Sequence, residues 1–329
     1  MTLDLSDQGK PQYSVSYGGQ EILKPSALGL VTNIGDYTQG LTLKGVVTNP
    51  VSDTYSLRNI KQSRVEYQAN ETVATYEKDG LTVMDIIFRV SNRDVAFRYK
   101  LYPKKDTRVC VVESETSSFV LPDGTTTFLC PQSKPMGGFA RTSPSYETSY
   151  TLDDAIGKNG WGEGHTFPCL FKVPGLSGAS GKTADPNWLL ISETGTDGGY
   201  VGCRLLNEQG GRYRIGFPQQ SELNGFGSVT AAMSLPGETP WRTMTIGPLA
   251  NIVETTVAFD LVQPKYKASQ EYIYGKGSWS WIIGMDPSCN FDEQKRYIDF
   301  SAAMGWQSVL IDAFWDKQIG YEKIAELAR

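Results

Sequence analysis

The sequence predicts a mainly β protein, in which a large antiparallel β-sandwich is followed by the first βα units of a (β/α)8 barrel that looks truncated. Two observations lead to this prediction. Up to about residue 262, short runs of alternating apolar and polar residues are separated by Gly, Asn, Asp and Pro. After residue 263 the pattern changes to strand, helix, strand and helix. Such alternation is typical of antiparallel sheets, whereas strands that alternate with helices indicate parallel strands with crossover helices.

The N-terminal part carries clear hairpin signals. Gly18-Gly19 lies within YSVSYGGQEI, and Asp79-Gly80 separates the two alternating runs of TVATYEKDGLTVMDIIFRV. A Gly-Gly or Asp-Gly pair between period-2 segments predicts a two-residue β-turn. The only departure from this strand pattern is a short helical turn expected near LANIVETT.

Three segments follow from this organisation. Residues 1–263 are predicted to form the β-sandwich domain, residues 264–276 a polar linker, and residues 277–329 the beginning of the barrel. Within the last segment, GSWSWIIG and WQSVLIDAF are predicted strands, the second of them buried. The stretch SCNFDEQKRYIDFSAAMG and the final YEKIAELAR carry the marks of helices.

The first of these helices has recognisable ends. Asn290 is a good N-cap residue, Glu293 stands at the capping-box spacing, and Gly305 is suited to the C-terminal end. A complete (β/α)8 barrel needs roughly 250 residues. The segment 277–329 is therefore expected to be a truncated barrel, with a small appendage on the sandwich as the alternative.

Composition excludes several classes of function. Lys plus Arg total 31 and Asp plus Glu total 36, giving a net charge of −5, so no nucleic-acid partner is expected. No apolar run approaches the roughly 18 residues of a membrane span, which argues against membrane insertion. A single His excludes zinc sites that need several histidines. The N-terminal residues lack the features of a signal peptide, which leaves a cytoplasmic protein or a removed signal open.

Several motifs together resemble glycoside hydrolase family 97. These are YSVSYGGQEILKPSALGL, NWLLISETG with GGYVGCRL, LPGETPWRTMTIG with LANIVETTVAFDL, and KGSWSWIIG with QKRYIDFSAAMGWQSVLIDAFWD. The resemblance implies an enzyme with an N-terminal β-sandwich and a catalytic barrel that hydrolyses α-glucosides or α-galactosides of oligosaccharides. It also implies a periplasmic location and a Ca²⁺ ion at the active site.

In this family the catalytic carboxylates come from later barrel strands, so they are expected beyond Arg329. The 329-residue chain by itself is therefore expected to be inactive. The alternative function is a non-catalytic, carbohydrate-associated β-sandwich module. The choice between glucoside and galactoside, and between inversion and retention, stays open.

Glu193 is the candidate metal ligand. It closes the apolar run WLLISE before a Gly-rich loop, where it could equally be a solvated loop carboxylate. The resemblance implies that this Glu donates one oxygen to calcium, which prefers carboxylates. Because Ca²⁺ takes 6–8 oxygen ligands, this chain is expected to bind it weakly or not at all.

Trp281, Asp312 and Trp315 are the candidate substrate-binding residues. Trp279 and Trp281 would point the same way from one strand, with core packing as the alternative to a sugar platform. Asp312 follows the apolar run SVLI, and burial of a carboxylate there is costly unless it is paired. It could contact a sugar hydroxyl or hold a structural hydrogen bond. The apolar strands of residues 277–329 also predict a homo-oligomer formed through this segment.

Overall fold

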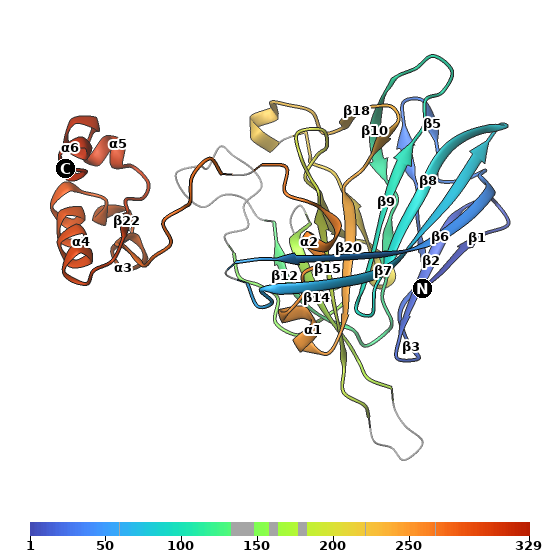
Figure 1. The fold of residues 1–329 in the computed structure, drawn as a ribbon, viewed down its shortest axis with the longest axis horizontal. Helices are drawn as coiled ribbons and strands as arrows, with labels where there is room; N and C mark the ends of the chain where they lie inside the picture. The colour runs from blue at the N-terminus through green and yellow to red at the C-terminus, as the bar shows by residue number, and fades with distance from the viewer. Residues whose placement is uncertain (59, 133–147, 158–163, 177–182, 221, 267) are drawn as a thin grey trace. The chain divides into compact units, whose positions relative to one another are not determined.

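A computed structural model describes the chain apart from residues 59, 133–147, 158–163, 177–182, 221 and 267. The chain forms two compact units, Met1–Gln263 and Pro264–Arg329, which are described separately below. The first unit consists mainly of antiparallel strands, as predicted (Figure 1).

Most strands of the first unit are short, but two of them have 15 residues each. They are β1 (Thr2–Leu5), β2 (Pro11–Tyr17), β3 (Gln20–Ala27), β4 (Leu30–Thr32), β5 (Gly35–Asp36), β6 (Thr42–Ser56), β7 (Arg64–Lys78), β8 (Leu81–Val90), β9 (Asp94–Leu101), β10 (Val109–Glu115), β11 (Ser118–Val120), β12 (Thr126–Pro131), β13 (Asp154–Ala155), β14 (His165–Val173), β15 (Asn187–Thr194), β16 (Arg204–Asn207), β17 (Arg212–Gly216), β18 (Ala231–Ser234), β19 (Gly237–Glu238) and β20 (Trp241–Gly247). Helix α1 (Leu249–Val253) lies where a helical turn was expected, and a second short helix, α2 (Val257–Leu261), follows it.

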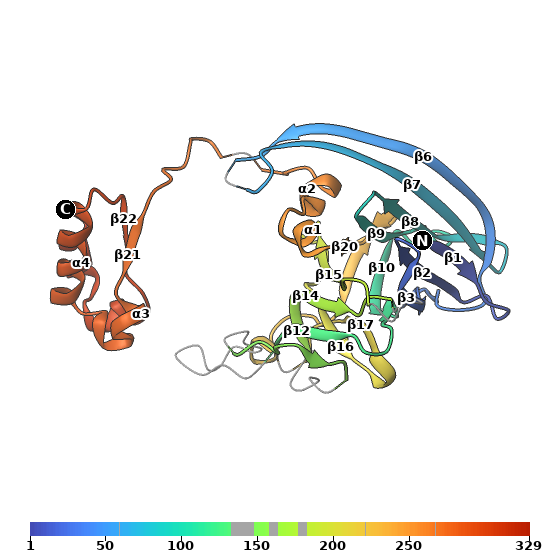
Figure 2. The ribbon, with the colours of Figure 1, turned by 90° about the horizontal axis from the view of Figure 1, so that it is seen from below.

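Most of these strands belong to one continuous sheet. Within the described residues its order is β1-β2-β3-β11-β17-β16-β14-β15-β20-β9-β8-β7-β6, with β12, β13 and β19 paired at its sides. A second sheet has the order β18-β10-β4-β5. In Figure 2 the long β6–β7 hairpin arches over the remainder of the unit.

The large sheet curls so that strands far apart in its order pack face to face. Tyr13 on β2 lies 5.4 Å from Phe97 on β9 and 6.0 Å from Phe88 on β8, measured between ring centroids. All three side chains are buried in the main hydrophobic core. The two layers of the predicted sandwich are thus formed largely by one sheet that closes around its own apolar face.

Both predicted hairpin turns are present. Tyr17 pairs with Gln20 across Gly18-Gly19, and Lys78 pairs with Leu81 across Asp79-Gly80. Asp79 has a φ of 53° and Gly80 a φ of 76°. Two successive residues with positive φ give the turn a twist that matches the flanking strands, and Asp-Gly accepts this conformation readily.

The second unit begins with an extended segment and then forms a small α/β structure. Its elements are β21 (Gly277–Trp279), α3 (Trp281–Gly284), the 3-10 turn η3 (Asp286–Ser288), α4 (Phe291–Ala303), β22 (Ser308–Leu310), α5 (Trp315–Gln318) and α6 (Tyr321–Leu327). β21 and β22 pair in parallel, as the strand–helix–strand pattern predicted. Asn290 caps α4 by accepting a hydrogen bond of 3.0 Å from the backbone N–H of Glu293.

No described helix of either unit has the length and apolar character needed to cross a membrane.

Two predictions for this unit were wrong in detail. GSWSWIIG is not one strand, because Ser280 adopts helical backbone angles and its carbonyl accepts a hydrogen bond from the N–H of Ile283. The strand therefore ends at Trp279, and Trp281 begins helix α3. The second strand was expected to be buried, but Leu310 is 52% exposed because the described unit has only two strands and leaves one face of β22 open. That these elements begin a (β/α)8 barrel stays a prediction.

The boundary near residue 263 leads to a test of independent folding. A chain that ends at Gln263 retains the whole main core, so it should unfold cooperatively at a melting temperature close to that of the 329-residue chain. Differential scanning calorimetry of both chains measures this. A broad or absent transition for the shorter chain would show that the sandwich depends on residues 264–329.

Candidate functional site

A buried ion-pair cluster surrounds Arg242 in the first unit. Arg242 on β20 has a side chain that is 1% exposed, and Glu115 at the end of β10 is 0% exposed. The guanidinium donates two hydrogen bonds to Glu115, from Nε to Oε1 at 3.0 Å and from Nη2 to Oε2 at 2.6 Å. Its Nη1 donates to Oε2 of Glu193 on β15 at 2.5 Å. Arg242 thus joins two strands of the large sheet to one strand of the smaller sheet.

Burial and the neighbouring charges shift the pKa values of Arg242 and Cys203. Burial by itself lowers the pKa of Arg242, but the negative charges around it and its hydrogen bonds to Glu115 together outweigh burial, so the pKa lies well above its ordinary value. Burial raises the pKa of the Cys203 thiol to about 12, although Arg242 acts in the opposite direction. Cys203 is therefore a neutral thiol at physiological pH and not a nucleophile. Two carboxylates and one guanidinium leave the cluster with a net charge of −1.

Glu193 is not the solvated loop carboxylate that was considered as an alternative. It lies on β15, its side chain is 14% exposed, and Oε1 accepts a hydrogen bond of 3.0 Å from the backbone N–H of Cys203. Both carboxylate oxygens are therefore oriented by the fold. Within the described residues, no group of three or more His, Cys, Asp or Glu side chains is placed to hold a metal ion. Glu193 by itself supplies at most two of the 6–8 oxygens that Ca²⁺ takes, so the described residues do not form a complete calcium site.

The second unit gathers aromatic and acidic side chains near the C-terminal ends of β21 and β22. The indole rings of Trp279 and Trp281 stack at 5.9 Å with an interplanar angle of 16°. Each indole N–H donates to a carboxylate, from Trp279 to Asp312 at 2.7 Å and from Trp281 to Asp286 at 2.8 Å. The two rings do lie side by side as predicted, although a turn into α3 and not a shared strand brings them together.

Asp312 has the hydrogen-bonding role that was one of its two predicted uses. Besides the Trp279 indole, it accepts a hydrogen bond of 2.6 Å from the backbone N–H of Ala313. Trp315 begins helix α5, and its ring packs edge-on against Tyr321 at 5.2 Å. Trp281 thus stacks face to face on another tryptophan, whereas Trp315 makes an edge-on contact with a tyrosine. Contact of Trp281, Asp312 or Trp315 with a sugar stays a prediction.

Sequence reasoning missed Arg242, Glu115 and the role of Trp279. Arg242 stands inside the run WRTMTIG, every residue of which is buried. A charged residue within such a run must find a partner of opposite charge, so this position carried a usable signal. Nothing in the sequence near Arg242 points to Glu115, which lies 127 residues away.

The cluster predicts a large effect on stability. Arg242→Met should lower the free energy of unfolding by about 3–5 kcal/mol, because Glu115 is left charged and buried without its partner. Urea unfolding of the variant measures the loss. Arg64→Met is a matched control, since Arg64 is exposed and its ion pair with Glu66 should contribute less than about 1 kcal/mol. Equal losses in the two variants would contradict a special role for Arg242.

Comparison with known proteins adds the family. Residues 1–264 match the family model described as the glycosyl-hydrolase 97 N-terminal domain. The chain is 32% identical over 304 residues to a probable retaining α-galactosidase of Streptomyces bingchenggensis, covering 92% of this chain and 42% of that protein. It is 44% identical to a protein whose crystal structure is that of a β-arabinopyranosidase, with a TM-score of 0.87, covering 99% of this chain and 51% of the other.

A more distant neighbour shows the same fold. It is a glycoside hydrolase family 97 enzyme from Pseudoalteromonas sp. strain K8 in complex with panose, with a TM-score of 0.72 and 20% identity. The match covers 96% of this chain and 47% of that enzyme. The chain thus spans about half the length of the relatives that it matches. Because the family model covers most of the sequence, the chain belongs to glycoside hydrolase family 97.

Proposed function

We propose that this chain is part of a retaining glycoside hydrolase that releases an α-galactosyl or β-L-arabinopyranosyl group from an oligosaccharide. The observation that carries the proposal is the 44% identity to a β-arabinopyranosidase along 99% of the chain. The 32% identity to a probable retaining α-galactosidase supports it. Of the two predicted substrate classes, this favours the galactoside over the glucoside.

Stereochemistry explains why one site could accept both groups. A β-L-arabinopyranoside has the ring configuration of an α-D-galactopyranoside but lacks the hydroxymethyl group on C5. The two substrates therefore present the same hydroxyls and the same leaving-group direction. Specificity between them depends on the space beside C5, and one methylene-sized difference in a pocket corresponds to about 1–3 kcal/mol of discrimination.

Within this chain, the proposed contribution to the substrate site comes from Trp281, with Asp312 and Trp315 at the rim. The stacked indoles offer a flat apolar surface, and Asp312 and Asp286 hold the two rings by their N–H groups. A retaining mechanism needs a nucleophile and an acid/base carboxyl about 5–5.5 Å apart. We assign both to the part of the relatives' length that this chain does not span.

A non-catalytic carbohydrate-binding module is the second candidate for the 329 residues alone. One observation favours it. Asp286 and Asp312 are each engaged by an indole N–H, so they serve as supports for aromatic rings and not as a free pair of catalytic carboxyls.

We propose Glu193 as one calcium ligand of the complete enzyme. Its carboxylate is held in place by Arg242 and by the N–H of Cys203, and the net negative charge of the cluster attracts a cation. Calcium would supply positive charge when bound.

A periplasmic location stays a prediction. Self-association through residues 277–329 also stays a prediction, and the exposed apolar side chains of Ile282, Ile283 and Leu310 support it.

The proposed activity can be tested with aryl glycosides. The complete enzyme should hydrolyse p-nitrophenyl α-galactoside or β-L-arabinopyranoside faster than the α-glucoside, while the 329-residue chain should give no detectable turnover. Trp281→Ala in the complete enzyme should raise KM by about tenfold, equivalent to about 1.4 kcal/mol of lost binding. Trp281→Phe, which retains a ring, is the control. Preference for the glucoside, or turnover by the short chain, would refute the proposal.

The calcium proposal predicts a difference between the short chain and the complete enzyme. EDTA should leave the melting temperature of the 329-residue chain unchanged, because one carboxylate is too few for tight binding. In the complete enzyme, calcium should raise the melting temperature, since a ligand that binds only the native state stabilises it.

Glu193→Gln should reduce that calcium-induced shift. The shift, and not the starting melting temperature, is the quantity compared, because this substitution also weakens the ion pair with Arg242. Glu113→Gln, at an exposed position on β10, is the matched control. An undiminished shift in Glu193→Gln would remove Glu193 from the set of ligands.

A further inference from the structure

The distal part of strand β7 lacks a strand partner on one of its edges. β7 pairs with β8 only as far as Asn70 and Val90, where β8 ends. β7 continues to Arg64, paired with β6 on its other edge. Within the described chain, no strand pairs with residues 64–69 along the edge of β7 that faces away from β6. Backbone N–H and C=O groups on this edge are thus available to a ligand.

Two adjoining pockets lie along this edge. One encloses about 290 Å³ and reaches from Gln62 to Asp260, and the other encloses about 390 Å³ and reaches from Pro50 to Asn92. They share Gln68, Ser91 and Asn92 as a common wall. We call the two pockets together the β7 groove. Each pocket is close to the lower end of the volume range of small-molecule sites, as suits a single sugar ring.

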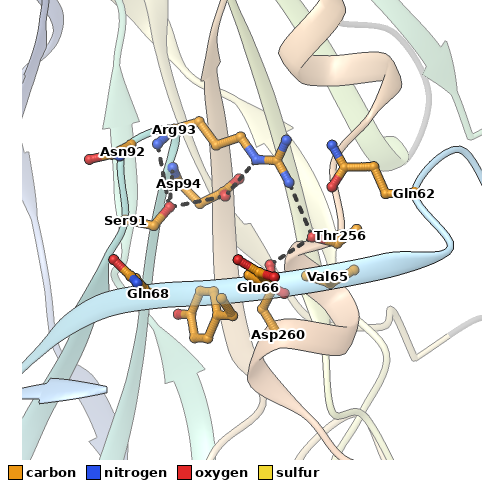
Figure 3. A pocket seen from close by; sticks show the side chains of 11 residues that line it. Gln62, Val65, Glu66, Gln68, Ser91, Asn92, Arg93, Asp94, Thr256 and Asp260 are labelled. Carbon is orange, nitrogen blue, oxygen red and sulfur yellow. Dashed lines mark hydrogen bonds and ion pairs between the residues drawn. The ribbon is translucent and has the colours of Figure 1, made fainter. Parts of the chain in front are cut away.

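One wall of the groove is formed by the turn at residues 91–94, which several hydrogen bonds hold in place. Asp94, 5% exposed, accepts hydrogen bonds from Thr245 at 2.6 Å and from Ser91 at 3.1 Å. Figure 3 shows Arg93 extending from the same turn toward Thr256, to which its Nη2 donates at 3.1 Å. These contacts order the groove wall without help from a ligand, which reduces the entropy that binding must overcome.

A second buried carboxylate closes the wall on the side of helix α2. Asp260, 8% exposed, accepts hydrogen bonds from Tyr55 at 2.5 Å and from Thr256 at 3.0 Å. Tyr55 belongs to β6, so this contact also ties the hairpin to the helix.

The chemistry of the lining selects a neutral polyhydroxylated ligand. Among the described residues, the side-chain amides of Gln68 and Asn92 have no hydrogen-bond partner, and each can both donate and accept. Sugar hydroxyls need this combination. Glu66, Asp94 and Asp260 outnumber Arg93 in the lining, so an anion is disfavoured. Val65 and Tyr67, both buried, form the apolar part of the lining.

We propose that the β7 groove is a second carbohydrate-binding site, which holds a neutral oligosaccharide of two or three sugar units without cleaving it. One ring occupies each pocket, and the amides of Gln68 and Asn92 contact the sugar at the junction. The site lies wholly within the first unit and uses none of the residues assigned to the substrate site. It therefore stands independently of the proposed hydrolytic activity.

The test uses the 329-residue chain with panose as the neutral trisaccharide and trigalacturonate as an anionic one. Isothermal titration calorimetry should show binding of panose and at least tenfold weaker binding of trigalacturonate. The double variant Gln68→Ala/Asn92→Ala should weaken panose binding at least tenfold. Both positions are exposed, so the fold should tolerate the change. Asn49→Ala, an exposed amide on β6 that lines neither pocket, is the matched control.

NMR locates the bound sugar. Panose should shift the side-chain amide signals of Gln68 and Asn92, whereas binding only in the second unit would shift the indole N–H signals of Trp279 and Trp281. The proposal is overturned if panose does not bind, if the double variant binds it as well as the control does, or if only the indole signals move. The last result would leave the proposed substrate site intact while removing the groove.

Discussion

The ion pair between Arg242 and Glu115 is the constraint on which the centre of the sandwich depends. Both side chains are removed from water, and an isolated charge there would cost several kcal/mol. The two hydrogen bonds between them compensate that cost only if β10 of the smaller sheet and β20 of the large sheet keep their spacing. Arg242 then uses its remaining nitrogen to orient Glu193 on β15. One guanidinium thus links the packing of the two sheets to the direction of a candidate metal ligand.

Polar groups also position the aromatic side chains of the second unit. Indole N–H groups that are partly buried need acceptors, and Asp286 and Asp312 provide them. Because each carboxylate holds one ring, the stacked pair of Trp279 and Trp281 has a defined orientation. This arrangement gives the acidic residues a supporting role toward the two rings.

Two separate roles in carbohydrate binding or hydrolysis are proposed for the sandwich, one from its membership in glycoside hydrolase family 97 and one from the β7 groove. Through Glu193 it is proposed to contribute one calcium ligand. Through the β7 groove it is proposed to hold a sugar chain by itself. The second role follows from the extra length of the β6–β7 hairpin, which runs beyond the end of β8 and leaves polar side chains and a strand edge facing a cavity.

The local features of this protein can be predicted from its sequence. Alternating residues predicted the strands, Gly18-Gly19 and Asp79-Gly80 predicted their turns, and Asn290 marked the start of α4, because each of these signals acts between near neighbours in the chain. The sequence also contained the motifs that indicated the family.

Three other features arise from long-range packing: one sheet curls into both layers, Trp281 leaves the strand, and Glu193 is bound by Arg242. Long-range packing also forms the β7 groove. These features depend on contacts between residues far apart in the sequence, such as Glu115 and Arg242 at a separation of 127 residues. No local pattern specifies which distant partner satisfies a buried charge, because that choice is made by the packing of the whole domain.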